Sequence, residues 1–287
     1  HVFLKNYSPI GSYLKRFGLF NVSIWRHLHK DRPDALVLMA WNNPTFWVAM
    51  LTCILHRIPF FFMTDANLEV ELAKGSWQTR LKGVLLGNTL FKIASGFLCA
   101  GSANQRLFTH WGVPGRKLIP FAYSWGYQSF LRVATELSSK RSQLRATWGI
   151  PEDSNVVLYC GRLSHEKNLF NLLEAYRQVK LSNKSLIIVG DGELNKPLRK
   201  KVAEYQLDSV LFVGFQNRKE INQFYAMSDV LVLPSIRETW GIVVNEAMCF
   251  SLPLIVSDQV GSTADMLQDG YNGFLFPGFE SANSHER

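Results

Sequence analysis

Short apolar runs that alternate with helix-spaced segments most strongly constrain the fold of this 287-residue chain. In the second half the runs lie at residues 156–160, 186–189, 211–213, 230–233 and 254–256. Leu169, Leu172 and Leu173 fall at helical spacing after the first run, and further helices are expected at 220–226 and 241–250. Continuous apolar strands separated by helices are typical of a parallel sheet covered on both faces. We therefore predict an α/β fold with a doubly wound second half.

The first half shows the same alternation. Strands are expected at residues 35–40, 59–63, 97–100 and 117–121, with helices at 44–56 and 104–111. Pro44 suits the first turn of its helix, and Ser102 is expected to cap the other. The apolar stretch 35–64 is interrupted by Asn42-Asn43-Pro44 and again by His56-Arg57. The remaining runs fall well short of the roughly 20 residues that a membrane-spanning helix needs.

A change of composition indicates where the two halves join. Residues 122–155 are mostly polar, and they predict a linker whose helix leads into the second domain. We place the domains at residues 1–124 and 125–287. The chain starts at His1 without a basic-then-apolar leader and stops soon after a strand-like turn, so both domains are expected to be partial.

Charge differs between the halves. Residues 1–150 hold 18 Lys and Arg against 6 Asp and Glu, or +12, whereas residues 151–287 hold 13 against 17, or −4. The basic first half favours an anionic partner such as an acidic acceptor or an anionic membrane surface, although a merely soluble basic face stays an alternative. No nucleic-acid motif accompanies it, so we expect no nucleic-acid partner.

The cysteines lack the spacing of a metal site or a disulfide framework. They are scattered singly, at Cys53, Cys99, Cys160 and Cys249. We expect reduced core residues in a cytoplasmic protein, with no metal bound.

Two cations follow the strand at 156–160. Arg162 comes directly after it, and Lys167 lies near the start of the next helix. An Arg fork, an ammonium and free helix N–H groups together suit a diphosphate. The alternative is a pair of ordinary solvated surface cations.

Glycine turns follow the next two strands. Gly190 and Gly192 enclose Asp191 after residues 186–189, which lets the backbone approach a ligand or simply forms a tight turn. This is not the GxGxxG of dinucleotide enzymes, and the following strand ends in Gly214-Phe215 rather than in the ribose-binding acid of that scheme. An NAD site is disfavoured. Gly214 and Phe215 suit the border of a nucleobase pocket, with core packing of Phe215 as the alternative.

Two carboxylates lie eight positions apart around the end of the strand at 230–233. Glu238 follows that strand, and Glu246 lies one turn into the next helix. Each carboxylate can accept two hydrogen bonds from a vicinal diol, and the amides near Thr239, Trp240 and Gly241 can bind an anion. A solvated loop acid with an ordinary helical Glu is the alternative. Sugar diol, diphosphate and ribose diol together describe a nucleotide sugar.

These motifs, taken in order, resemble one enzyme family. The segments that carry the resemblance are Gly161-Arg162-Leu163, Lys167-Asn168, Val189-Gly190-Asp191-Gly192, Val213-Gly214-Phe215, Leu233-Pro234-Ser235, Glu238-Thr239-Trp240-Gly241, Glu246-Ala247, Asp269-Gly270 and Asn272-Gly273. They are similar to the donor half of the family 4 (group 1) glycosyltransferases. The first half resembles the family more loosely, through Arg32-Pro33-Asp34, residues 64–68, residues 101–104 and Gly112-Val113-Pro114.

The resemblance implies a GT-B architecture, in which two Rossmann-like domains with doubly wound parallel sheets face a cleft. It implies that Arg162 and Lys167 hold the donor diphosphate, that Glu238 contacts the transferred sugar and that Glu246 contacts the ribose. Glu238, Arg162 and Lys167 would be catalytic. The family retains anomeric configuration and typically needs no metal or cofactor. Thr64-Asp65 is either an acceptor contact or a helix N-cap.

The expected function is therefore transfer of a sugar from a nucleotide sugar to a glycan or lipid-linked acceptor, in surface polysaccharide or glycolipid assembly. The basic first half would bring the protein to the inner face of the cell membrane as a peripheral enzyme. Two alternatives stay open: a nucleotide-sugar epimerase of the same fold, and a non-catalytic nucleotide-sugar-binding fragment.

Overall fold

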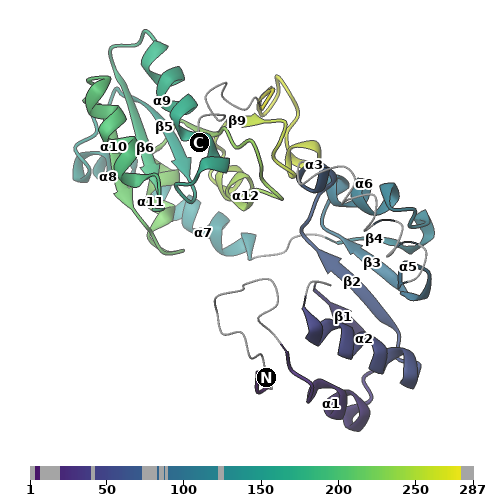
Figure 1. Cartoon of the computed structure of the whole chain (residues 1–287). Helices are drawn as coiled ribbons and strands as arrows, with labels where there is room; N and C mark the ends of the chain where they lie inside the picture. The colour runs from purple at the N-terminus through teal and green to yellow at the C-terminus, as the bar shows by residue number, and fades with distance from the viewer. Residues whose placement is uncertain are drawn as a thin grey trace. The chain divides into compact units, whose positions relative to one another are not determined.

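The chain forms two compact units, each built on a parallel sheet (Figure 1). The computed structural model describes residues 4–6, 20–39, 43–72, 83, 87, 90–121 and 126–278. The first unit comprises His1–Tyr123 and the second Ser124–Arg287. The prediction of an α/β fold with two parallel sheets is confirmed.

The first unit holds a four-stranded sheet in the order β1-β2-β3-β4. Its strands are β1 (Leu36–Leu38), β2 (Phe60–Thr64), β3 (Gly96–Cys99) and β4 (Leu118–Pro120). Its helices are α1 (Ile24–Asp31), α2 (Pro44–His56), α3 (Leu68–Leu72), α5 (Leu90–Ile93) and α6 (Ser102–His110), with a 3-10 turn at Gly115–Lys117. The predicted helix at 44–56 is confirmed, with Pro44 in its first turn.

Aromatic side chains form the core of this unit. Phe62, Phe97 and Phe108 are at most 2% exposed. The rings of Phe62 and Phe97 stack with centroids 5.6 Å apart, and Phe91 meets Phe97 edge-on at 5.0 Å. Such pairs contribute about 0.5–1.5 kcal/mol each beyond the area they bury. The phenylalanines of β2 and β3 thereby attach α5 and α6 to the sheet.

Two predicted helix caps in the first unit are wrong. Ser102 is the first residue of α6, and Gly101, at φ +96°, takes the cap position. The side chain that bonds at this helix end is Asn104, whose Oδ1 accepts from the amide of Ala100 at 3.2 Å. Before α3, Asn67 rather than Thr64 caps the helix.

Asn67 caps α3 because it lies directly before the first residue of the helix, whereas Thr64 lies four residues before it. Asn67 Oδ1 accepts from the amide of Val70 at 2.8 Å, three residues on, as an N-cap does. Thr64 lies too far upstream, and its Oγ1 instead accepts from the amide of Ala66 at 3.2 Å. An acceptor contact at Thr64-Asp65 stays a prediction.

The second unit holds a six-stranded parallel sheet in the order β10-β9-β8-β5-β6-β7. Its strands are β5 (Asn155–Cys160), β6 (Lys184–Val189), β7 (Val210–Gly214), β8 (Val230–Leu233), β9 (Leu254–Ser257) and β10 (Gly273–Phe276). Its helices are α7 (Tyr127–Ser138), α8 (Arg141–Thr147), α9 (Leu169–Gln178), α10 (Asn195–Glu204), α11 (Ile221–Met227), α12 (Ile242–Cys249) and α13 (Thr263–Met266), with a 3-10 turn at His165–Lys167. The predicted strands β5 to β9 are confirmed.

The predicted linker is not a linker over its described part. Residues 122–125 lie outside the described residues, but α7 and α8 belong to the second unit. Phe130 of α7 is 2% exposed in the core of that unit. Arg145 of α8 is 3% exposed, and it donates to the carbonyls of Met227 (3.0 Å) and Ser154 (3.0 Å) and to a carboxylate oxygen of Asp229 (2.8 Å). The sequence did not predict that α8 packs into the second unit, because the side chain that it buries there is an arginine and not an apolar residue.

All four cysteines are free, in agreement with the sequence. Burial raises the pKa of the Cys53 and Cys99 thiols to about 11, which keeps them protonated and unreactive at neutral pH. Within the described ranges, no helix has the length and apolar character needed to cross a membrane.

Candidate active site

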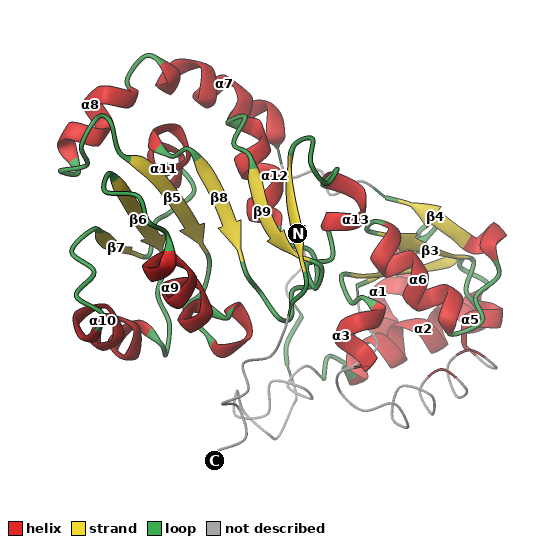
Figure 2. Ribbon diagram, turned by 90° about the horizontal axis from the view of Figure 1, so that it is seen from above, coloured by secondary structure: helices red, strands yellow, loops and turns green. Residues whose placement is uncertain are grey.

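The order of the second sheet brings two distant loops together. β5 lies between β6 and β8, so the chain crosses to one side of β5 first and to the other side later (Figure 2). Ligands of doubly wound sheets bind at such a switch point, outside the carboxyl ends of the strands. The loops after β5 and β8 meet there, and the amide of Ile236 donates to the carbonyl of Glu166 at 2.9 Å.

Lys167 and Glu238 form an ion pair across this switch point. The Lys167 ammonium donates a hydrogen bond to Glu238 Oε2. Their side chains are only 14% and 17% exposed. Residue 167 ends the 3-10 turn after β5, whereas residue 238 follows β8, so 71 positions of sequence separate them. The pairing joins a cation predicted for the diphosphate to a carboxylate predicted for the sugar.

Backbone pairing fixes the position of Glu238. Glu238 makes an isolated parallel bridge with Val260. Its amide donates to the carbonyl of Gln259 at 3.3 Å, and its carbonyl accepts from the amide of Gly261 at 3.0 Å. The loop after β9 therefore supports the loop after β8, a contribution that sequence reasoning missed because residues 259–261 carry no charged group.

Arg162 lies on the same loop after β5 as Lys167. It is exposed, and its guanidinium makes no ion pair or hydrogen bond with the described residues. Its carbonyl is held by the hydroxyl of Tyr159, which donates at 2.9 Å. An anchored backbone with a solvent-facing guanidinium leaves the side chain available to an anion.

Glu166 adds an acidic group to the same loop. Burial acts to raise its pKa, but the Ser164 hydroxyl, its own amide, Lys167 and Arg162 together lower it. The carboxylate is therefore ionised at neutral pH and reduces the positive charge of the loop. No role was predicted for it.

Bare backbone lines the ends of three neighbouring strands. Gly161, Gly190 and Gly214 follow or end β5, β6 and β7, and all three have positive φ, at +153°, +129° and +73°. A Cβ on Gly190 would lie 1.9 Å from the carbonyl oxygen of Gly161. The Gly190 amide donates to the carbonyl of Gly214 at 2.8 Å. These turns pack so closely that residue 190 has no room for a side chain. This packing explains why residue 190 is a glycine.

Asp191 and Phe215 lie further along the same edge. Asp191 Oδ1 accepts from the amide of Gly192 at 2.8 Å and from Asn195 Nδ2 at 2.9 Å. The Gly192 amide and then Asn195 lower the pKa of Asp191. Its carboxylate supports the start of α10, and donor contact by Asp191 stays a prediction. Phe215 is 78% exposed, so the packing alternative does not hold for it.

Glu246 is the second predicted carboxylate, and it lies on α12. The hydroxyl of Tyr225, on α11, donates to Glu246 Oε2 at 2.6 Å. Burial raises the pKa of Glu246, while the Tyr225 hydroxyl and the Arg218 charge lower it in part. Sequence reasoning missed Tyr225, which is fully buried and gives only the signal of a core residue at the end of a helix.

Thr239, Trp240 and Gly241 connect the two carboxylates. Gly241 precedes α12 at φ +85°, and a Cβ there would lie 2.8 Å from Val260. Trp240 Nε1 donates to Asn245 Oδ1 at 2.9 Å across the first turn of the helix. Thr239 and Trp240 are half-buried. The segment is thus fixed at both ends, with the amides of the α12 N-terminus following it.

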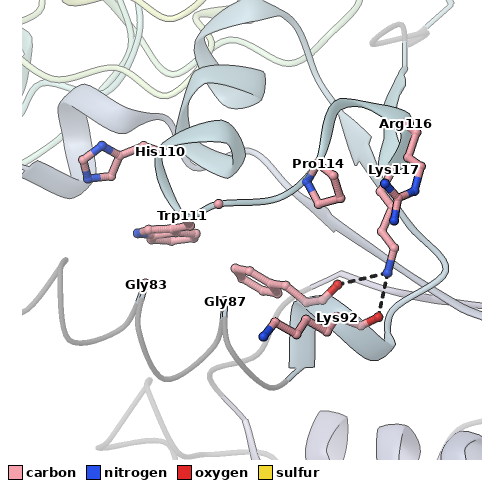
Figure 3. Close-up of a pocket in the computed structure, with 10 residues that line it drawn as sticks. Gly83, Gly87, Lys92, His110, Trp111, Pro114, Arg116 and Lys117 are labelled. Carbon is pink, nitrogen blue, oxygen red and sulfur yellow. Dashed lines mark hydrogen bonds between the residues drawn. The ribbon is translucent and has the colours of Figure 1, made fainter.

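A separate cavity of about 740 Å³ lies in the first unit (Figure 3). Its walls include Phe91, Trp111 and Arg116. Lys117 lies beside it, and its ammonium donates to the carbonyls of Lys92 and Ala94, each at 2.7 Å. Residues 116–117 precede β4, so the cavity borders the amino ends of the strands. Ligands of such sheets bind at the opposite edge, and the cavity is no part of the predicted site.

Relatives with known names match about half of this chain. The α-D-kanosaminyltransferase of Streptomyces kanamyceticus is 31% identical over 53% of this chain and 40% of its own length. The lipopolysaccharide 1,2-N-acetylglucosaminetransferase of Salmonella typhimurium is 31% identical over 47% of this chain and 38% of its own length. The matched region thus spans about two fifths of either relative.

Solved structures share the fold over both units. The Anabaena protein HepE, determined with UDP, has a TM-score of 0.72 at 22% identity, covering 89% of this chain and 67% of that one. The same protein has also been determined with UDP-glucose. This likeness shows that the chain has the GT-B fold.

A family profile gives the assignment. The profile described as glycosyl transferases group 1 matches residues 140–287, which include every residue predicted for the donor site. With its two parallel sheets, its strand-end glycines and its paired Lys167 and Glu238, the chain belongs to the group 1 glycosyl transferases.

Proposed function

We propose that this protein transfers a sugar from a nucleotide-diphosphate sugar to a hydroxyl of a glycan or lipid-linked acceptor, as a hexosyltransferase-type enzyme. The observation that carries the proposal is the Lys167–Glu238 ion pair at the switch point of the second sheet. One member of the pair suits a phosphate and the other a sugar hydroxyl, so the two together match the junction between diphosphate and sugar.

The remaining groups extend the site in both directions. The exposed Arg162 guanidinium would bind the diphosphate beside Lys167. Glu246 would accept hydrogen bonds from the ribose diol, and Phe215 would stack on the base. The glycine turns at residues 190 and 214 allow the ligand to approach the backbone. The second unit would thus hold the donor, and the first unit the acceptor.

Catalysis in this proposal is mainly electrostatic. As the bond between the sugar carbon and the phosphate oxygen breaks, negative charge grows on the leaving diphosphate, where Arg162 and Lys167 stabilise it. The acceptor oxygen bonds to the same carbon from the same face, and its proton passes to the leaving phosphate. The anomeric configuration is therefore retained. Because two side-chain cations neutralise the phosphate, the proposed reaction uses no metal and no cofactor.

We propose a lipid-linked or glycan acceptor in surface polysaccharide or glycolipid assembly at the cytoplasmic face of a membrane. Two features support this acceptor class. One is the relative that acts on lipopolysaccharide. The other is the charge of the first unit, where residues 1–123 hold 14 Lys and Arg against 5 Asp and Glu, or +9.

A donor screen followed by product analysis tests the proposal. Calorimetric titration with UDP-, GDP- and ADP-sugars is expected to identify one donor that binds. The Arg162→Gln variant should lower the affinity for that donor about tenfold or more, since a charge-assisted hydrogen bond contributes about 1.5–3 kcal/mol. The screen should use sugar acceptors and lipid extracts in parallel, with NMR of the product anomer. Epimer formed without acceptor would instead identify an epimerase. Binding of no nucleotide sugar would refute the proposal.

A further inference from the structure

Helix α2 presents a continuous apolar stripe to solvent. Trp47, Leu51, Ile54 and Leu55 are 40%, 56%, 37% and 80% exposed. They fall at positions i, i+4, i+7 and i+8, which share one face of a helix. The opposite face carries Ala49, Met50, Thr52 and Cys53, which are all buried. The helix is therefore apolar on both sides, although only one side faces the core.

Helix α1 lies alongside α2 (Figure 1). At one end the amide of Asn21 donates to Thr45 Oγ1 at 2.9 Å. At the other end His29 Nδ1 and His56 Nε2 are 3.1 Å apart. The two helices therefore run in the same direction, with α1 against the side of α2 that carries Thr45 and His56. We call their outer faces together the α1–α2 surface and define it as residues 22–32 and 44–57.

The α1–α2 surface has the composition of a membrane-docking face. Arg26, Lys30 and Arg57 are exposed on it. Trp25 is 43% exposed, and the Arg26 guanidinium lies 5.7 Å from its ring centroid. Tryptophans and long basic side chains beside leucines suit the boundary between lipid headgroups and acyl chains. Asp31 is the one acid within residues 22–32 and 44–57.

Charge decides which partner this surface fits. The first unit carries +9, so two copies meeting through this face would bring like charges together. An anionic bilayer complements that charge, with each basic residue near the surface strengthening binding about fivefold. The apolar stripe follows the outer face of a helix instead of lining a groove, which suits a planar partner.

We propose that the α1–α2 surface binds anionic membranes, with the stripe of α2 inserted among the acyl chains and Arg26, Lys30 and Arg57 at the phosphates. The proposal deepens the membrane part of the proposed function and rests on it. A lipid-linked acceptor would then be presented at the membrane to which the first unit is bound.

Vesicle sedimentation of the full chain tests the stripe. The protein should bind vesicles of phosphatidylcholine with phosphatidylglycerol and bind phosphatidylcholine alone far more weakly. The L51Q/L55Q variant should lower the partition constant at least about tenfold, because two leucines would no longer be buried in lipid. Leu181→Gln, at a residue 50% exposed in the second unit, is the matched control and should have no effect. Equal binding by wild type and L51Q/L55Q would overturn the proposal.

Charge and position are tested separately. The R26Q/K30Q variant should lose binding to anionic vesicles, about fivefold per charge, whereas Lys196→Gln on α10 should lose none. Brominated lipids should quench the fluorescence of wild type more than that of Trp47→Phe, and Trp148→Phe in the second unit is the control. Quenching that is unchanged in Trp47→Phe would contradict insertion of the stripe. A lipid-free dimer that L51Q/L55Q dissociates would show that a second copy, not lipid, covers the surface.

The assay separates this proposal from the proposed reaction, because it contains no nucleotide sugar. Glu246→Ala should weaken donor binding and leave vesicle binding intact. Vesicle binding in a protein that binds no nucleotide sugar would refute the reaction alone. Donor turnover in a protein that ignores anionic vesicles would refute membrane docking alone.

Discussion

The hydroxyl of Tyr225 donates a 2.6 Å hydrogen bond to the carboxylate of Glu246, which joins α11 to α12 beneath the predicted ribose site. Tyr225 is fully buried, and its ring stacks on Phe250 with centroids 5.4 Å apart. Burial raises the pKa of Glu246 above its ordinary value of 4.5. The protein therefore keeps a carboxylate in a place that disfavours its charge, which is common for groups that serve a ligand.

The buried charge of Glu246 is expected to lower the stability of the protein at neutral pH. A carboxyl whose folded pKa is raised stabilises the fold fully below its unfolded pKa, and this contribution is lost as the pH rises through the folded pKa. Glu246→Gln, which stays neutral, should therefore melt higher than wild type at pH 7 to 8, and the difference should vanish near pH 4. The same variant should bind the donor about tenfold or more weakly. Thermal melts across pH with donor titration check this. A variant less stable than wild type at pH 8 would contradict it.

Tyr225→Phe is predicted to act through Glu246. The substitution keeps the ring and its packing but removes the hydrogen bond that lowers the pKa of Glu246, so that pKa should rise further. The pH at which donor affinity reaches half its maximum should therefore move upward, with KM changed more than kcat. Tyr176→Phe, which removes a hydroxyl bonded to Ser209 at 2.8 Å on another helix, is the control. A purely structural role would lower stability in both variants without moving the pH profile.

The Lys167–Glu238 ion pair predicts non-additive effects on stability. Either Lys167→Met or Glu238→Gln removes this ion pair from a site where both side chains are less than one fifth exposed, and each should cost about 1–3 kcal/mol of unfolding free energy. The double variant should be more stable than the sum of the two losses predicts. Donor binding should be lost in all three variants. Urea unfolding with donor titration measures both quantities, and strictly additive costs would show that the two groups do not interact in solution.

Gly190 and Gly214 should differ in their tolerance of a side chain. Gly190→Ala would place Cβ 1.9 Å from the Gly161 carbonyl oxygen, so the turn must open, and we expect a loss of more than about 4 kcal/mol or no folded protein. At Gly214 a Cβ meets no atom within 4 Å, and only the positive φ opposes it. Gly214→Ala should therefore cost about 1–2 kcal/mol. Similar melting temperatures for the two variants would argue against the packed turn.

Phe215→Ala should separate binding from stability. A side chain that is 78% exposed contributes little to folding, so the melting temperature should stay unchanged. If the ring stacks on the base, nucleotide affinity should fall by about 1–3 kcal/mol. Isothermal titration with the free nucleotide checks this, and Tyr271→Ala, at a residue 82% exposed elsewhere in the unit, is the control. Unchanged affinity in Phe215→Ala would remove it from the site.

Local pattern was enough to predict much of the second unit. The runs at β5, β6, β8 and β9 are apolar on both faces, so a parallel sheet is the arrangement that buries them. Residues 241–250 were predicted helical and form α12 at Ile242–Cys249. Glycines after strands predicted tight turns, and Gly190 and Gly214 both have a positive φ. Approach of a ligand to these turns stays a prediction.

Capping and burial of polar groups could not be predicted in the same way. Ser102 has the residue type of a cap, but Gly101 occupies the cap position and Asn104 makes the bond. Arg145 belongs to a polar segment, and only its partners from residues 152–154 and 227–229 explain its burial. The cap is decided by backbone conformation at the neighbouring Gly101, whereas Arg145 is buried by groups from distant parts of the chain.

The sequence by itself determined the strands, the glycine turns and the chemical types of the site residues, because each depends on neighbours within one turn or one strand. Tertiary structure alone decided that β5 and β8 are adjacent, which places the Lys167 ammonium on the Glu238 carboxylate. It also decided that Tyr225 lies beneath Glu246 and that the stripe of α2 faces outward. These contacts follow from strand order and helix packing, which bring together residues far apart in sequence. Such contacts produce no periodic pattern in the sequence, so they could not be predicted from it.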